Sequence, residues 1–275
     1  MLRTRVITAL VLLAGLLAGI FLLPPWGWLA LAAIICAAAA WEWGGLGGFA
    51  VGPRSVFAAL MGLACLLTGA MSGLAGDAAS APAGLAALYL ASGLFWVAVV
   101  PLWLARKWRI TGAAGTVLVG LVVLLPPALA LAHLRMLGPW LLLAVMAATF
   151  VSDIAAYFTG RAFGRHKLAP AISPGKTWEG AGGAVAGVLV FALIVLAASA
   201  PSLLDAPTVL LVVPLLAAFT AVGVLGDLFE SLLKRQAGVK DSGSMLPGHG
   251  GILDRIDSLT STLPLAGLAA LWLAL

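Results

Sequence analysis

The chain has 275 residues, of which 63% are hydrophobic and only 9% are charged, and its formal net charge is +5. A soluble domain carries about 25% charged residues, so this composition excludes an ordinary soluble globular protein. It also excludes a disordered chain, which needs few apolar residues and many charges. The two cysteines, Cys36 and Cys65, lie in apolar stretches and give neither a disulfide framework nor a metal-binding spacing. The sequence therefore predicts a polytopic membrane protein.

Nine apolar stretches follow one another along the chain, and a helix of about 20 residues crosses a bilayer. We therefore expect an all-α fold with about nine transmembrane helices. Residues 1–137 are expected to form about five N-terminal spans, and residues 138–275 a C-terminal catalytic region of about four spans with two basic cytoplasmic loops. The expected spans cover residues 5–23, 26–41, 56–75, 83–104, 114–132, 138–160, 180–199, 207–229 and 258–275.

The basic residues predict the orientation of these spans. With nine spans and a cytoplasmic N-terminus, Arg135 is the one residue among the 15 Lys and Arg that falls outside. Because cytoplasmic loops carry the excess of Lys and Arg, this asymmetry favours a cytoplasmic N-terminus and an external C-terminus.

The acidic residues predict where the chemistry lies. Most of them fall between Asp153 and Asp257. In the N-terminal half, Glu42 stands between Trp41 and Trp43, and we expect it at the membrane interface. Residues 1–150 are therefore expected to serve burial and anchoring, and the C-terminal half is expected to hold any active site.

The first polar cluster combines Asp153, Tyr157 and Arg161, which are spaced at one-turn intervals on a single helix face. An aspartate inside a span is costly and usually faces a polar interior. This pattern favours a functional role for Asp153, and the alternative is an interhelical hydrogen bond.

The second cluster is the segment Ser173-Pro-Gly-Lys-Thr-Trp-Glu-Gly180. It is not a P-loop, because position 170 is Pro where that motif needs Gly, and no strand is expected before it. We predict a short basic turn before a helix that starts near Gly180. Ser173, Lys176 and Thr177 would bind phosphate there, and the alternative is simple helix capping.

The third cluster carries the strongest signal. Asp227, Glu230 or Ser231, and Lys234 lie on one stripe of a helix, and Asp254 and Asp257 repeat this spacing at the start of the last helix. A glycine-rich loop joins the two stripes, and its backbone can approach a ligand closely. Two carboxylate-bearing helices with nearby Lys and Arg suit a Mg²⁺–polyphosphate site. The alternative is a solvated loop whose charges serve solubility.

The same region resembles a known family. Residues 231–257 read S-x-x-K-R-x4-K-D followed by P-G-H-G-G-x-x-D-R-x-D, which closely resembles the signature of phosphatidate cytidylyltransferases. The segments around Asp153–Gly164 and Ser173–Gly180 also resemble that family, so the likeness covers roughly residues 150–260 in detail. It implies an integral enzyme of the bacterial cytoplasmic (inner) membrane that is a homodimer. The implied reaction joins CTP and phosphatidic acid, a membrane lipid, with Mg²⁺ on the cytoplasmic side, and it releases pyrophosphate.

On this basis we assign roles to individual residues. Asp227 and Asp254 are expected to bind Mg²⁺, with Asp257 and Asp241 as the next candidates, and a second cation is left open. Lys234 and Asp257 complete the catalytic set with these two aspartates. The expected substrate-binding residues are Asp153, Arg161, Ser173, Lys176, Thr177, Arg235, Lys240, Asp241, His249, Gly250, Gly251 and Arg255.

Three alternatives stay open at this point. A CTP-dependent kinase of a membrane lipid would use similar chemistry but transfer the γ-phosphate. A CDP-alcohol phosphotransferase would need a D-G-x2-A-R motif, which does not follow Asp254. An ion or solute transporter would also place acidic residues in its spans, but transporters tend to show internal repeats, and this sequence has none. No nucleic-acid partner is expected.

Overall fold

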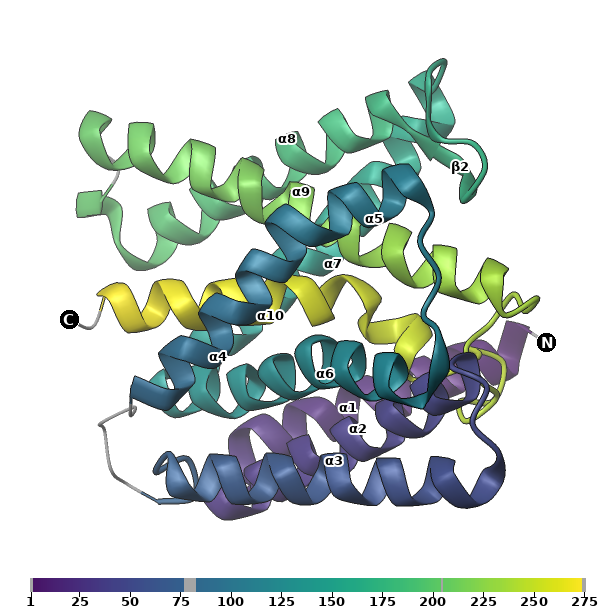
Figure 1. The fold of residues 1–275 in the computed structure, drawn as a ribbon. Helices are drawn as coiled ribbons and strands as arrows, with labels where there is room; N and C mark the ends of the chain where they lie inside the picture. The colour runs from purple at the N-terminus through teal and green to yellow at the C-terminus, as the bar shows by residue number, and fades with distance from the viewer. Residues whose placement is uncertain (1, 77–82, 204, 274–275) are drawn as a thin grey trace.

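The computed structural model describes residues 2–76, 83–203 and 205–273, which form a bundle of helices (Figure 1). In chain order the elements are α1 (Leu2–Leu22), α2 (Pro25–Leu46), α3 (Val51–Met71), α4 (Ala83–Leu94), the π-helical turn η1 (Phe95–Val99), α5 (Val100–Arg106), α6 (Gly112–Leu137), α7 (Pro139–Phe163), β1 (Lys167–Ala169), β2 (Ser173–Thr177), α8 (Trp178–Ser199), the 3₁₀ turn η2 (Pro201–Leu203), α9 (Ala206–Gln236) and α10 (Leu253–Leu273).

Each predicted apolar stretch contains a helix in the described part of the chain. The helices extend beyond several predicted bounds, because polar residues can continue a helix outside the bilayer. Helix α9 thus runs two turns past the predicted limit of residue 229. The fourth stretch is interrupted by η1, two residues before Pro101, whose ring removes a backbone donor.

Seven helical segments are long and apolar enough to cross a membrane, and Val6–Leu22 is a shorter apolar helix. The protein is therefore an integral membrane protein. Within the described residues α10 does not meet the same standard, because its first half contains Asp254, Asp257 and several Ser and Thr side chains. The seven segments are Pro25–Leu46, Val51–Met71, Gly84–Arg106, Gly112–Leu137, Pro139–Phe163, Trp178–Ser199 and Ala206–Gln236.

The fold is all-helical apart from one short hairpin. Strands β1 and β2 form an antiparallel hairpin in which Lys167 pairs with Thr177 and Ala169 pairs with Ser173. The segment predicted as a basic turn is thus mostly a strand. The hairpin is held against α9 because Ile172, in its connection, is buried with Leu228 and Leu232 of that helix. This tertiary contact was not visible in the local sequence pattern.

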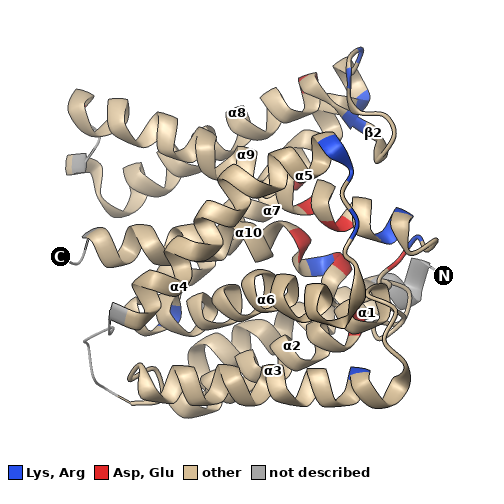
Figure 2. Ribbon diagram, in the orientation of Figure 1, with Lys and Arg blue, Asp and Glu red and all other residues tan. Residues whose placement is uncertain are grey.

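The two chain ends lie at opposite ends of the bundle (Figure 1). Lys and Arg gather mainly at the end where the N-terminus lies, together with the acidic residues of α9 and α10 (Figure 2). The structure therefore separates an apolar body from one charged end, as the sequence predicts.

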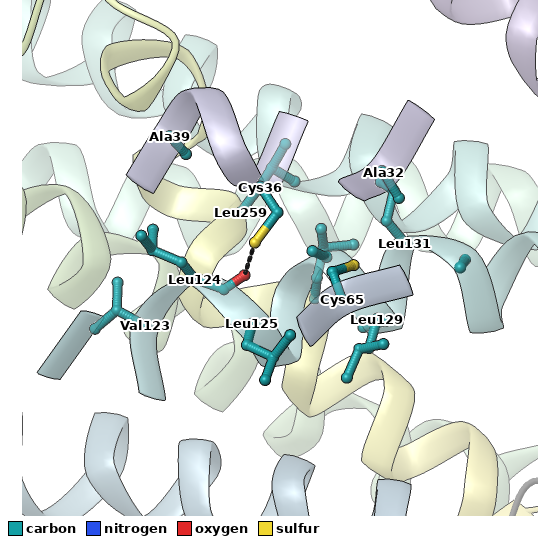
Figure 3. Packing of buried hydrophobic residues seen from close by; sticks show 14 of the residues in the cluster. Ala32, Cys36, Ala39, Cys65, Val123, Leu124, Leu125, Leu129, Leu131 and Leu259 are labelled. Carbon is teal, nitrogen blue, oxygen red and sulfur yellow. Dashed lines mark hydrogen bonds between the residues drawn. The ribbon is translucent and has the colours of Figure 1, made fainter. Parts of the chain in front are cut away.

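Helix α6 forms the centre of the apolar body. Its residues are buried without interruption from Val123 to Leu134, so it is surrounded by other helices on all sides. Small side chains of α2 let it approach α6 closely, and the Cys36 thiol points at the Leu124 carbonyl oxygen, 3.7 Å away (Figure 3). Both cysteines are buried free thiols.

Helices α7 and α8 pack closely because α8 presents glycines to α7. A Cβ atom added at Gly183 would lie 2.0 Å from the Thr159 hydroxyl oxygen, and one added at Gly187 would lie 2.6 Å from the Ala155 methyl group. Gly182, the neighbour of Gly183, faces open space. This packing places the part of α7 that follows Asp153 against the first half of α8.

We therefore expect Gly183→Ala to destabilise the protein by about 1–3 kcal/mol, because the new methyl group overlaps Thr159. Gly182→Ala is the matched control and should leave stability unchanged or slightly higher, since Ala is the better helix former. Thermal unfolding of both variants in detergent measures the difference. Equal unfolding temperatures would contradict the close α7–α8 contact.

Candidate active site

The approach of α9 to α10 brings the acidic stripes of the two helices together. It depends on Gly226, where a Cβ atom would lie 2.6 Å from the Ser261 hydroxyl and 2.7 Å from the Asp257 carbonyl oxygen. The Ser261 hydroxyl donates across the interface to the Val222 carbonyl oxygen at 2.9 Å. Because Gly226 precedes Asp227 directly, the absence of a side chain there sets that carboxylate beside the first turns of α10.

Three carboxylates converge around one ammonium group. The Lys176 ammonium lies 2.6 Å from Asp227 Oδ2, and Asp153 and Asp257 are close enough to interact electrostatically with both groups. The Ser258 hydroxyl donates to Asp153 Oδ1 at 3.4 Å. We call Asp153, Lys176, Asp227 and Asp257 the open cluster, since Asp153 is exposed and the others are partly buried.

A second group of charges is enclosed, and in it one ammonium lies between two carboxylates. The Lys234 ammonium lies 2.7 Å from Asp254 Oδ1 and 3.1 Å from Glu230 Oε1, and these three side chains are only 5–12% exposed. Asp254 Oδ2 accepts hydrogen bonds from the backbone N–H groups of Ser242 at 2.9 Å and Gly251 at 2.8 Å. Asp254 therefore ties both ends of the glycine-rich loop to α9. Glu230, Lys234 and Asp254 form the closed cluster.

Glu42 also belongs to this end of the molecule, where it is enclosed by the protein. Its side chain is fully buried, and Oε2 accepts hydrogen bonds from the Ser242 hydroxyl at 3.0 Å and from the Leu253 N–H at 2.9 Å. The predicted span stopped at residue 41, but α2 continues to Leu46 and carries Glu42 into the protein. A lone carboxylate beside a long apolar stretch was the available signal.

The loop glycines make room for these carboxylates. Gly250 has a φ of +81°, which favours glycine, and a Cβ atom there would lie 2.8 Å from Asp254 Oδ2. A Cβ atom at Gly251 would lie 2.4 Å from Glu42 Oε2. The backbone of His249 donates to the Leu246 carbonyl oxygen at 2.9 Å, and its buried Nδ1 has no hydrogen-bond partner among the described residues. The glycines thus face protein carboxylates.

The remaining predicted residues are distributed around this centre. Thr177 accepts from the Gly180 N–H at 3.1 Å and so caps α8, which is the alternative role considered for it. Ser173 lies in β2, beside the open cluster's Lys176. Arg161, at the end of α7, donates to the Tyr157 hydroxyl at 3.2 Å. Arg235, Lys240 and Asp241 are exposed.

Arg255 is the one predicted residue that faces elsewhere. It lines an apolar cavity of about 600 Å³ together with residues of α1, α2 and α6, whereas Asp257 faces α9. Ile256 and Leu259 of α10 line the same cavity. Helical spacing explains this, since residues 255 and 257 point to different sides of α10.

The donor set of the open cluster suits a hard cation. Carboxylate oxygens are preferred ligands of Mg²⁺, which is usually held by one or two carboxylates plus phosphate oxygens and waters. In the described part of the chain no three acidic, His or Cys side chains come close enough to hold one ion by themselves. The arrangement therefore fits a cation that arrives with a phosphate-bearing ligand, and it does not form a complete protein cage.

The chain is a helical membrane protein with carboxylates, lysines and a glycine-rich loop at one end. Such a site is typical of membrane proteins that bind charged substrates at the membrane surface. Comparison with known proteins is more specific. The model of the cytidylyltransferase family matches residues 3–272, so the chain belongs to that family.

Individual relatives agree with this family. A phosphatidate cytidylyltransferase of Pseudomonas aeruginosa is 39% identical over the whole chain and 98% of its own length. The enzyme of the same name from Haemophilus influenzae is 50% identical over 127 residues, which are 46% of this chain and 44% of the relative. The one from Thermotoga maritima is 43% identical over 45% of this chain and 46% of its own length.

The closed cluster yields a stability prediction. Lys234→Met removes the ammonium between two buried carboxylates and should destabilise the protein by about 3–5 kcal/mol, because an uncompensated buried charge is costly. Lys240→Met is the control, since Lys240 is exposed. Thermal unfolding in detergent measures both variants. If Lys234→Met unfolded at the same temperature as Lys240→Met, the closed cluster would not hold the loop.

Proposed function

We propose that the chain is a phosphatidate cytidylyltransferase, which converts CTP and phosphatidic acid to CDP-diacylglycerol and pyrophosphate in phospholipid biosynthesis. The observation that carries this proposal is the match over 98% of a relative with that name. The site supports it independently, since carboxylates and lysines that suit a cation and polyphosphate meet at one end of a membrane-embedded bundle. A lipid phosphate and a water-soluble nucleotide can meet only at such an end.

We infer the membrane topology from the same features. The charged end that lies with the N-terminus supports a cytoplasmic N-terminus and a cytoplasmic active site (Figure 2). The seven long apolar segments together with Val6–Leu22 and α10 would make nine passes, which would place the C-terminus outside. The bacterial relatives support placement in the bacterial inner membrane. The division into residues 1–137 and a catalytic region of residues 138–275 stays a prediction.

The proposed reaction is an in-line displacement at the α-phosphorus of CTP. An oxygen of the lipid phosphate forms a bond to this phosphorus while the bond to the β-phosphate oxygen breaks, and pyrophosphate leaves with the electron pair. The attacking phosphate is already anionic, so the protein needs to position and neutralise charge more than to remove a proton. Lys176 is the basic group best placed for this, because it stands among the open carboxylates.

Bound Mg²⁺ would neutralise phosphate oxygens and orient the triphosphate. We propose that Asp227 and Asp257 of the open cluster hold it, with Asp153 beside them. Asp254 is less suited to this role than the sequence pattern suggests, because Lys234, Ser242 and Gly251 already occupy its oxygens. We therefore assign Asp254 to holding the loop, and Arg161, Arg235 and Lys240 to phosphate binding at the exposed rim.

A homodimer remains an expectation from the family resemblance. Several glycines that would allow close packing between subunits are used inside the chain, whereas Gly48 and Gly182 have no neighbour within 4 Å of an added Cβ atom. Gly183 and Gly187 contact α7, a Cβ atom at Gly45 would lie 2.9 Å from the Arg54 guanidinium, and one at Gly47 would lie 2.3 Å from Thr116. They therefore give no support for an interface.

A labelled-product assay tests the function. With phosphatidic acid and Mg²⁺, we expect label from the cytidine of CTP to enter the lipid fraction and a chelator to abolish this transfer, since carboxylates alone would repel the phosphates. Label from the γ-phosphate in the lipid would instead identify a lipid kinase. If neither label entered the lipid and the protein carried a solute into liposomes, a transporter would be favoured.

Variants of the aspartates test the assigned roles. Asp227→Asn and Asp257→Asn should each reduce cytidylyl transfer about 10²–10³-fold while the protein inserts and purifies normally, because they remove charge from the open cluster. Asp254→Asn should lower both transfer and thermal stability, because Asp254 anchors the loop. Asp205→Asn is the control, since Asp205 is an exposed helix cap at the start of α9 and Asn also caps helices. Near-normal transfer by Asp227→Asn would contradict the assignment.

A further inference from the structure

Glu42 is a buried carboxylate from the otherwise apolar N-terminal half of the chain. It lies on α2, about 200 residues in sequence from the groups it contacts, and its exposed fraction is zero. A carboxylate in this environment needs hydrogen bonds or opposite charge to compensate for lost hydration. Within the described residues Oε2 accepts from a hydroxyl and a backbone N–H, whereas the buried Oε1 has no hydrogen-bond partner.

The contacts of Glu42 lie at both ends of the glycine-rich loop. Ser242 is at the beginning of the loop and Leu253 is the first residue of α10, and both donate to the same oxygen, Oε2. The N–H of Leu253 belongs to the positive end of a 21-residue helix, which favours a negative group there. Glu42 therefore joins the two ends of the loop to each other and to α2.

The shape of the loop is fitted to this carboxylate. A Cβ atom at Gly243 or at Gly251 would lie 2.4 Å from an oxygen of Glu42, so neither position has room for a side chain. The backbone on both sides of the loop can lie directly against Glu42 for this reason. The fit links a residue of the N-terminal half to the sequence signature of the C-terminal half.

Glu42 is also connected to the charged residues of the site. Ser242 donates its hydroxyl to Glu42 and its N–H to Asp254, and Asp254 in turn pairs with Lys234. A shift of the loop at Ser242 would thus act on Asp254, which lies in the first turn of the helix that carries Asp257. The path from Glu42 to the open cluster consists of hydrogen bonds and one helix turn.

We propose that Glu42 is a positioning residue of the active site: its carboxylate fixes the glycine-rich loop and the first turn of α10, and through them the geometry of Asp254 and Asp257. It is buried away from the open cluster and acts through other residues. The expected effect on kcat rests on the proposed cytidylyl transfer. The ordering of the loop by Glu42 is independent of that function.

The test uses the full chain in detergent or nanodiscs. Glu42→Ala should lower kcat about 10²-fold, as expected when a catalytic group is displaced by about 1 Å, and should raise hydrogen exchange of residues 242–253. Glu42→Gln keeps one acceptor oxygen and should recover most of the lost kcat. Cys36→Ala is a buried truncation on the same helix, whose thiol points at the carbonyl oxygens of Met61 and Leu124, so it controls for a general loss of packing and should change neither readout.

A double variant tests whether Glu42 acts through Ser242. If the hydroxyl contact carries the effect, Glu42→Ala with Ser242→Ala should have the kcat of Glu42→Ala alone, and not the product of the two losses. The proposal is overturned if Glu42→Ala keeps wild-type kcat and loop exchange, or if Cys36→Ala loses kcat equally. If the wild-type protein showed no cytidylyl transfer, the proposed function would be refuted. Hydrogen exchange of residues 242–253 would still show whether Glu42 orders the loop.

Discussion

Carboxylates buried in an apolar helical bundle must find partners, and this requirement organises the charged end of the protein. Glu42, Glu230 and Asp254 are enclosed, and their partners are Lys234 or donors of the glycine-rich loop. Asp153 and Asp227 belong to the open cluster, in which Lys176 is the ammonium group. The enclosed carboxylates hold the glycine-rich loop in place. The open cluster has more carboxylates than ammonium groups, so it carries net negative charge. A cation and a polyphosphate are the ligands that such an arrangement accommodates.

Close approach between helices makes this arrangement possible. Gly226 lets α9 contact α10, Gly183 and Gly187 let α8 contact α7, and Gly251 lets the loop contact α2. Without side chains at these positions the backbones approach to distances that bring short carboxylates from different helices together. Packing in the membrane-spanning part and chemistry at its end are therefore set by the same small residues.

The closed cluster serves stability, and the open cluster serves the proposed function. The closed cluster holds the glycine-rich loop through Asp254, which accepts from Ser242 and Gly251. This matters because the loop leads into the helix that carries Asp257. Glu42 extends the closed cluster into the N-terminal half, which thereby takes part in the site. The apolar helices of that half are a support for the loop as well as a membrane anchor.

The sequence alone determined the apolar helices, the charged end, the stripes on α9 and α10 and the family, because hydropathy, helical spacing and a contiguous signature are local properties. It could not assign Glu42, since which face of α2 meets the loop depends on how distant helices pack. Nor could it separate Asp254 from Asp257, or place Arg255 beside an apolar cavity, because these residues share one short segment and differ only in direction. The hairpin of β1 and β2 likewise depends on tertiary structure, because Ile172 is buried against α9. Only the tertiary structure decided which carboxylates are paired and which remain open.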